Sequence, residues 1–163
     1  MGARTTRMFD WVLRLGAWLV LPVSALLFLQ WPLREWVQRG SREANDLGQC
    51  LFALYVALAI AAATRANMHL TAGSISARYR PPTRHRLRVA GIVFGVVPWI
   101  AFVGWSSRST VWASAVGLER FPDTGNAGYF IVKLALWLLL ACLLVASVLD
   151  LGAGKARAKD SPP

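Results

Sequence analysis

Long apolar runs divide the chain into four segments, each long enough to cross a membrane as a helix. The clearest is Leu47–Thr64, which contains no charged residue. As an α-helix this run would be about 27 Å long, close to the thickness of the hydrocarbon core of a bilayer. Three more runs cover residues 11–31, 87–105 and 129–149. The pattern predicts an all-α integral membrane protein with four transmembrane helices in one domain, residues 1–163.

A short amphipathic stretch is predicted directly after the first run. Leu33, Trp36 and Val37 recur at i, i+3 and i+4, and charged residues cover the opposite side. This pattern is typical of a helix that lies in the membrane interface, here over residues 33–42. Pro32 is expected to stop the first span before it. The alternative is that the first helix simply continues out of the membrane.

The remaining polar segments are predicted to be helix ends, loops and tails. Asn45 and Asp46 suit the start of the second span, because a short side-chain oxygen can accept hydrogen bonds from unpaired helix N–H groups. Residues 106–128, which end in the turn-rich sequence PDTGNAG, are predicted to form a loop. Residues 1–10 and 152–163 are predicted to be tails.

The basic residues predict how these helices are oriented. Twelve of the 18 lysine and arginine residues lie on the side that holds both termini and residues 65–88. The other six lie on the opposite side, at Arg34, Arg39, Arg42, Arg108, Arg120 and Lys133. Because positive charge accumulates on the cytoplasmic side of membrane proteins, both termini are predicted to be cytoplasmic.

The composition agrees with a membrane protein. With 56% hydrophobic residues and a mean hydropathy of +0.45, the chain has more apolar surface than a soluble domain of 163 residues could bury. The net charge of +10 does not indicate nucleic-acid binding, because the basic residues lie where the spans meet water. Cys50 and Cys142 would differ in depth by about 8 Å, which argues against a disulfide between them.

Groups that could perform catalysis or transport are sparse in the predicted spans. None of the four contains Asp, Glu or His, whereas a protein that itself carries protons or cations generally needs such a group at depth. His69 and His85 lie on one side of the membrane, so a haem within the bilayer is not expected. The sequence has no Cys-x-x-Cys, phosphate loop or metal-binding cluster. A non-catalytic, partner-binding membrane subunit without a metal or cofactor of its own is therefore predicted.

In one segment, residues 46–70, Asp46 opens the predicted second span, and Arg65 and His69 follow its end. This spacing resembles the small membrane subunit of tripartite ATP-independent periplasmic (TRAP) transporters, in which an acidic residue opens span two and Arg-x-Gly-x-His-Ile closes it. The resemblance covers nearly the whole chain. The second segment is FPDTGNAGYFIVKLALWLLLACLL, residues 121–144. The chain departs from the family at two positions. Asp46 stands where Glu is usual, and Asn67 stands in place of the glycine of the Arg-x-Gly-x-His-Ile motif. Shorter similarities occur at Arg84, Leu87 and Gly104–Trp105.

The resemblance implies that this chain works with two other proteins. A periplasmic solute-binding protein would capture an organic acid or related small solute. A large TRAP membrane subunit would move it inward, driven by sodium that binds to the large subunit. The small subunit would add four spans to the fixed scaffold. It would be a multi-pass protein of a bacterial or archaeal cytoplasmic (inner) membrane, in contact with lipids and not with nucleic acid.

Four residues are candidates for a partner or lipid interface. Arg65 and His69 would bind lipid phosphates or the large subunit, and plain interfacial anchoring is equally compatible with their position. Asp46 is either a helix cap or a partner contact, with the cap favoured. Lys133 would contact the large subunit or the docked binding protein, although extension of its ammonium group to the membrane surface is favoured.

Two other functions remain as alternatives. A small self-sufficient carrier acting as a dimer would need an ionisable group within the bilayer core. A membrane-embedded redox or quinone enzyme would show haem absorption, or a reactive Cys50 or Cys142.

Overall fold

The computed structural model describes residues 3–36, 41–66 and 79–159. Within these ranges the chain is helical, apart from short turns and the loop of residues 117–128. The elements are α1 (Ala3–Ala17), α2 (Val20–Trp36), α3 (Arg42–Arg65), α5 (Pro81–Gly91), the π-helical turn η1 (Ile92–Val96), α6 (Val97–Val116) and α7 (Tyr129–Lys159).

Among the described residues, four helical stretches are long and apolar enough to cross a membrane. They are Arg4–Trp36, Arg42–Arg65, Arg86–Val116 and Tyr129–Leu151. Helices α1 and α2 together form the first, and the third combines α5, η1 and α6. The predicted all-α class with four membrane spans is confirmed.

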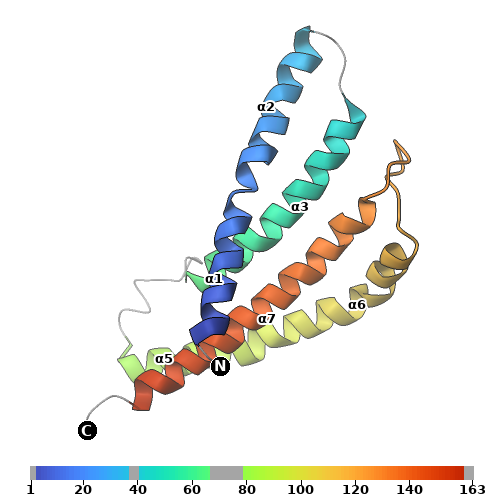
Figure 1. Ribbon diagram of the computed structural model, residues 1–163. Coiled ribbons are helices and arrows are strands. Elements are labelled where there is room, and N and C mark those ends of the chain that lie inside the picture. The colour runs from blue at the N-terminus through green and yellow to red at the C-terminus, as the bar shows by residue number, and fades with distance from the viewer. Residues whose placement is uncertain (1–2, 37–40, 67–78, 160–163) are drawn as a thin grey trace.

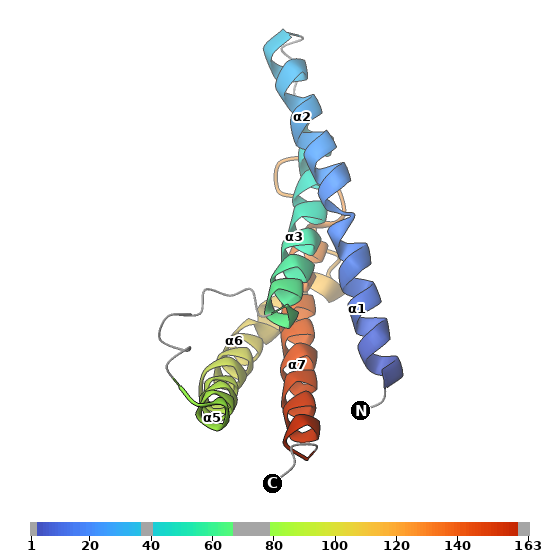
Figure 2. The same cartoon turned by 90° about the vertical axis from the view of Figure 1, so that its left-hand side faces the viewer.

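The four spans lie side by side in one layer. In Figure 1 the order across the layer is α1/α2, α3, α7 and α6, so neighbours in space are not always neighbours in sequence. Figure 2 looks along the layer and shows its lower ends fanning apart, with α5 and α6 on one side of α7 and α1 on the other. Below, the end with the start of α1 and the end of α7 is called the terminal end, and the opposite end, with residues 117–128, the loop end.

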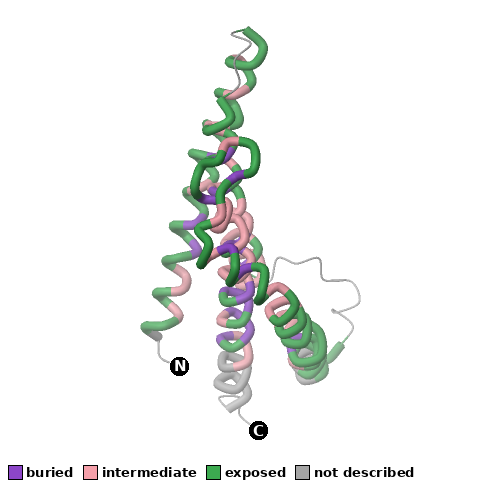
Figure 3. The backbone as a smooth tube through the Cα atoms, turned by 90° about the vertical axis from the view of Figure 1, so that its right-hand side faces the viewer, coloured by how far each residue is buried: buried purple, intermediate pink, exposed green. Residues whose placement is uncertain are grey.

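Close packing is concentrated around α3 and α7. Leu13 of α1, Ala61 of α3 and Cys142 of α7 form a buried cluster where three helices meet. Ala61 is fully buried, and its small side chain allows the helix backbones to approach closely. Figure 3 shows the buried positions along these helices, whereas α2 and α6 expose most of their residues. The layer therefore has a packed middle and two largely exposed edges.

Proline residues account for two irregularities in the spans. Pro22 has no N–H, so it cannot bond the Trp18 carbonyl, which accepts from the Leu21 N–H at 3.1 Å instead. This tighter turn separates α1 from α2. In the third span, the wide turn η1 lies directly before Pro98, where the regular helical bonding is again interrupted.

The first span is longer than predicted at both ends. Residues 3–10, predicted to be part of a tail, belong to α1. Pro32 lies inside α2, so the prediction that it stops the span is wrong. It removes only one bond close to the helix end, where water can replace it. Leu33–Trp36 continue the helix, which was the alternative to a separate interfacial stretch; residues 37–40 lie outside the described residues.

The third span also extends beyond its predicted end. Helix α6 continues to Val116, so the first half of the predicted loop 106–128 is helical. The Ser107 hydroxyl donates to the Val103 carbonyl at 2.7 Å and accepts the Trp137 indole N–H at 3.2 Å. A polar residue that looked like part of a loop is thus satisfied by its own helix and by α7.

Helix α3 begins before its predicted start. It opens at Arg42, and the N-cap is Ser41, whose hydroxyl accepts the Ala44 N–H at 3.1 Å. The prediction that Asp46 caps this helix is therefore wrong, since Asp46 lies one turn inside it. At the other end of the chain, α7 continues through most of the predicted tail to Lys159.

The substitution Gly16→Ala tests the close approach of α1 and α3. A Cβ atom at Gly16 would lie 2.6 Å from Leu58 Cδ1, whereas one at Gly48 would meet nothing within 4 Å. Both glycines are helical, so both alanine variants gain helix propensity. We expect Gly16→Ala to be less stable than the control Gly48→Ala by about 1–3 kcal/mol, the usual effect of overpacking. Unfolding in detergent micelles measures this, and equal midpoints would contradict the contact.

Candidate functional site

A buried carboxylate joins α3 to the loop that precedes α7. Asp46 is only 7% exposed and accepts hydrogen bonds from the Thr124 hydroxyl at 2.5 Å and the Asn126 side-chain amide at 3.2 Å. One turn further along α3, the Cys50 thiol donates to the Gly128 carbonyl at 3.5 Å. A carboxylate is stable away from water only when it has such donors. These contacts hold the loop on α3.

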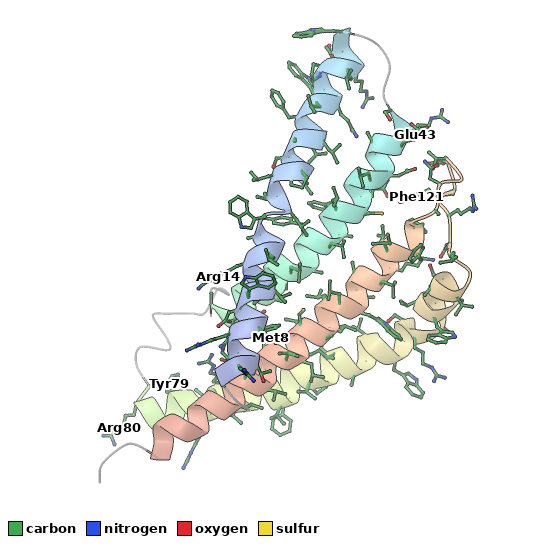
Figure 4. The ribbon with its side chains drawn as sticks, viewed as in Figure 1. Met8, Arg14, Glu43, Tyr79, Arg80 and Phe121 are labelled. Atoms are coloured by element: carbon green, nitrogen blue, oxygen red, sulfur yellow. The ribbon has the colours of Figure 1, made fainter. Side chains whose placement is uncertain are left out.

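The loop is folded tightly around this carboxylate. The Phe121 N–H donates to the Asn126 carbonyl and the Gly125 N–H to the Phe121 carbonyl, both at 2.8 Å. Gly125 and Gly128 have φ angles of 70° and 137°, which only glycine adopts easily. The buried Phe121 ring packs edge-on against the Tyr129 ring at 5.4 Å, next to the start of α7 (Figure 4). The sequence PDTGNAG therefore forms a specific turn with its own internal bonds.

A second polar contact joins the loop to α7. The Lys133 ammonium donates to the Glu119 carboxylate at 2.5 Å and lies 5.2 Å from the centre of the Tyr129 ring. The Lys133 ammonium holds the pKa of Glu119 below its ordinary value of 4.5, and the Ser114 hydroxyl adds to this effect. Lys133 therefore forms an ion pair with a residue of its own chain. This role was not predicted from the sequence.

Two ion pairs join neighbouring helices at the terminal end. The Arg65 guanidinium donates to Asp10 at 3.2 Å and links α3 to α1. The Arg88 guanidinium donates to Asp150 at 2.6 Å and links α5 to α7. Each pair is partly exposed, so each is expected to contribute no more than about 1 kcal/mol to stability. Their main effect is to restrain how the helix ends are positioned.

The four residues named from the sequence do not form one site. Asp46 and Lys133 both contact the loop of residues 117–128 at the loop end. Arg65 lies at the opposite end of α3 and pairs with α1. His69 lies outside the described residues. The structure therefore brings two of the four together, through a loop that both of them contact.

Sequence reasoning missed the partners in these contacts. Thr124 and Asn126 appear in the sequence only as turn-forming residues. Asp10 and Asp150 carry a better signal, because each is an acidic residue at the end of a span, on the side where arginine and lysine predominate. An acidic residue in that setting predicts an ion pair, although not with which arginine.

The described ranges contain no group of three His, Cys, Asp or Glu side chains that could hold a metal ion. Comparisons with protein-family models, with curated proteins and with solved structures found no match to this chain. Any proposal for the function of this chain must therefore be based on its own residues and their contacts.

The substitution Asp46→Ala tests whether the carboxylate holds the loop. It removes a charged acceptor with two donors, which typically destabilises a protein by about 1.5–3 kcal/mol. We expect faster amide hydrogen exchange across residues 117–128 and a lower unfolding midpoint. The control is Asp123→Ala, which removes an exposed carboxylate from the same loop. If both variants exchange alike, other contacts hold the loop.

The Glu119–Lys133 pair predicts a dependence of stability on pH. Because the pKa of Glu119 is lowered by folding, its contribution is present above the unfolded-state pKa and is lost as the pH falls through the lower folded-state value. We expect Glu119→Gln to unfold at a lower temperature than the wild type at neutral pH. The difference should disappear well below pH 4.5. Glu35→Gln, at an exposed position of α2, is the control, and a difference that persists in acid would refute the assignment.

Proposed function

We propose that the chain is the non-catalytic small membrane subunit of a TRAP transporter. In this role it scaffolds a large transport subunit during sodium-driven, binding-protein-dependent uptake of an organic acid or related small solute. The observation that carries the proposal is a contact between the two segments that resemble the family. Asp46 opens the first segment and is hydrogen-bonded to Thr124 and Asn126 in the second.

This contact supports the proposal because it joins the two resembling segments through polar side chains and not only through apolar packing. Thr124 and Asn126 are 78 and 80 residues from Asp46 along the chain. An apolar span needs no buried carboxylate near its start, and burial of an unpaired one is strongly unfavourable. The three residues therefore form one unit whose parts require each other.

The arrangement of the spans in one layer supports a scaffold role. The third span forms one edge of the layer and exposes large apolar side chains, with Phe94 of η1 and Phe102 and Trp105 of α6 exposed by 82%, 72% and 71%. In a membrane such side chains face lipid or another membrane protein. A layer leaves more of this surface available than a closed bundle of the same helices. We infer that part of it contacts the large subunit.

The polar contacts at both ends support a subunit that moves as one body. The loop and α7 are bonded to α3 at the loop end, and ion pairs join α1 to α3 and α5 to α7 at the terminal end. Contacts at both ends oppose sliding of one helix past another. We assign the sodium and substrate sites to the large subunit, because the apolar middles of these four spans carry no Asp, Glu or His.

The proposal also includes an orientation. With both termini in the cytoplasm of a bacterium or archaeon, the loop end faces the periplasm. The turn held by Asp46 would then lie on the side from which a solute-binding protein docks.

Reconstitution in proteoliposomes tests the proposed function. This chain is combined under a sodium gradient with a large TRAP membrane subunit and a TRAP solute-binding protein from the same organism, and each is left out in turn. We expect solute accumulation only with all three, and none with this chain alone. Accumulation by this chain alone would refute the proposal, as would full uptake by the other two proteins without it.

A further inference from the structure

A shallow cavity of about 360 Å³, wide open to its surroundings, lies between α6 and α7 at the loop end. This volume lies at the lower end of the range of sites that hold small molecules, about 300–1,000 Å³. The cavity is lined by Thr110, Ala113, Ser114, Gly117, Glu119 and Lys133. It differs from the apolar surfaces around it because one cation, one anion and two hydroxyl groups share a small space.

The Ser114 hydroxyl is buried and, in the described part of the chain, makes no hydrogen bond of ordinary geometry. Ser114 is only 4% exposed, and its hydroxyl is close enough to the Glu119 carboxylate to help lower the pKa of that group. A ligand in the cavity that accepts from this hydroxyl would supply a better-formed bond. Lys133 and Glu119 are 26% and 37% exposed, so both are accessible to the same ligand.

The cavity lies where lipid headgroups are expected. Lys133 is one turn inside the start of α7, and Ser114 is close to the end of α6. On α6, Arg108 lies over the Trp105 ring at 4.2 Å, and Trp112 is 66% exposed. Tryptophan and arginine side chains of this kind collect at the level between hydrocarbon and headgroups. A ligand that enters from the membrane would therefore bring its headgroup to this depth.

We propose that the cavity binds the headgroup of a phospholipid that carries both a phosphate and a primary ammonium group. The Lys133 ammonium and the Ser114 hydroxyl donate to the phosphate, and the Glu119 carboxylate accepts from the ammonium. When the lipid binds, the Lys133–Glu119 ion pair separates. Lys133 then pairs with the lipid phosphate and Glu119 with the lipid ammonium, so neither side chain is left unpaired. The proposal does not depend on the assignment to a transporter.

This arrangement distinguishes among common phospholipids. A lipid with a phosphate and no amine would place negative charge beside Glu119 and leave that carboxylate without a partner. A choline headgroup has the positive charge but no N–H to donate to a carboxylate. Phosphatidylethanolamine has both the charge and the donors.

Lipid binding to the purified full-length chain tests the proposal. Native mass spectrometry in detergent compares phosphatidylethanolamine with phosphatidylcholine and phosphatidylglycerol of the same acyl chains. We expect phosphatidylethanolamine to bind roughly fivefold more tightly or better, since one favourable interfacial charge contact contributes about 1 kcal/mol. Lys133→Gln should lose a similar factor, and Glu119→Gln should remove the preference over phosphatidylcholine.

Matched variants separate the site from general effects on folding. Arg108→Gln removes an exposed positive charge from α6 outside the cavity lining, and should leave lipid binding unchanged. Ser114→Ala removes a single buried oxygen and should weaken binding without preventing folding, which thermal unfolding checks. Equal binding of the three lipids, or equal losses in Lys133→Gln and Arg108→Gln, would overturn the proposal. So would tight binding of water-soluble glycerophosphoethanolamine, because the site would then take a free solute.

Discussion

The loop end of this protein depends on the buried carboxylate of Asp46. Its two donors come from the turn before α7, and that turn also positions Phe121 against Tyr129, the first residue of α7. Helix α7 packs against both α3 and α6, so it is central to the layer. One hydrogen-bonded carboxylate therefore influences how the central helix is placed against its neighbours. Because the carboxylate is shielded from water, its partners cannot easily be replaced by solvent.

The polar and apolar contacts occupy different levels of the structure. In the middle of the layer, where lipid is as apolar as the side chains, helices associate through close fit, as at Ala61 and at Gly16 against Leu58. At both ends, where water is available, charged and hydrogen-bonded side chains connect neighbouring helices. Close fit in the middle brings the helices together, and the polar contacts at the ends limit which arrangements are possible.

A single layer of helices leaves surfaces that a closed bundle would cover. The edge formed by α6 presents large aromatic side chains to its surroundings, while the cavity beside Lys133 presents charged and hydroxyl groups. These surfaces differ in chemistry and therefore in the partners they suit. An apolar edge matches another membrane protein or acyl chains, and a small polar cavity at the interface matches a headgroup. The two proposals thus concern different parts of the molecule.

The number and type of the elements could be predicted from the sequence, because apolar run length is a local property. The start of α7 at Tyr129 was also predicted, since the turn-rich sequence before it ends there. Helix ends near Pro32 and Ser107 were mispredicted, because local polarity did not show which groups the helices and their neighbours satisfy. By itself the sequence determined that the chain forms four long apolar helices. Only the tertiary structure decided their order in the layer and the partners of Asp46, because those depend on contacts between residues about 80 positions apart.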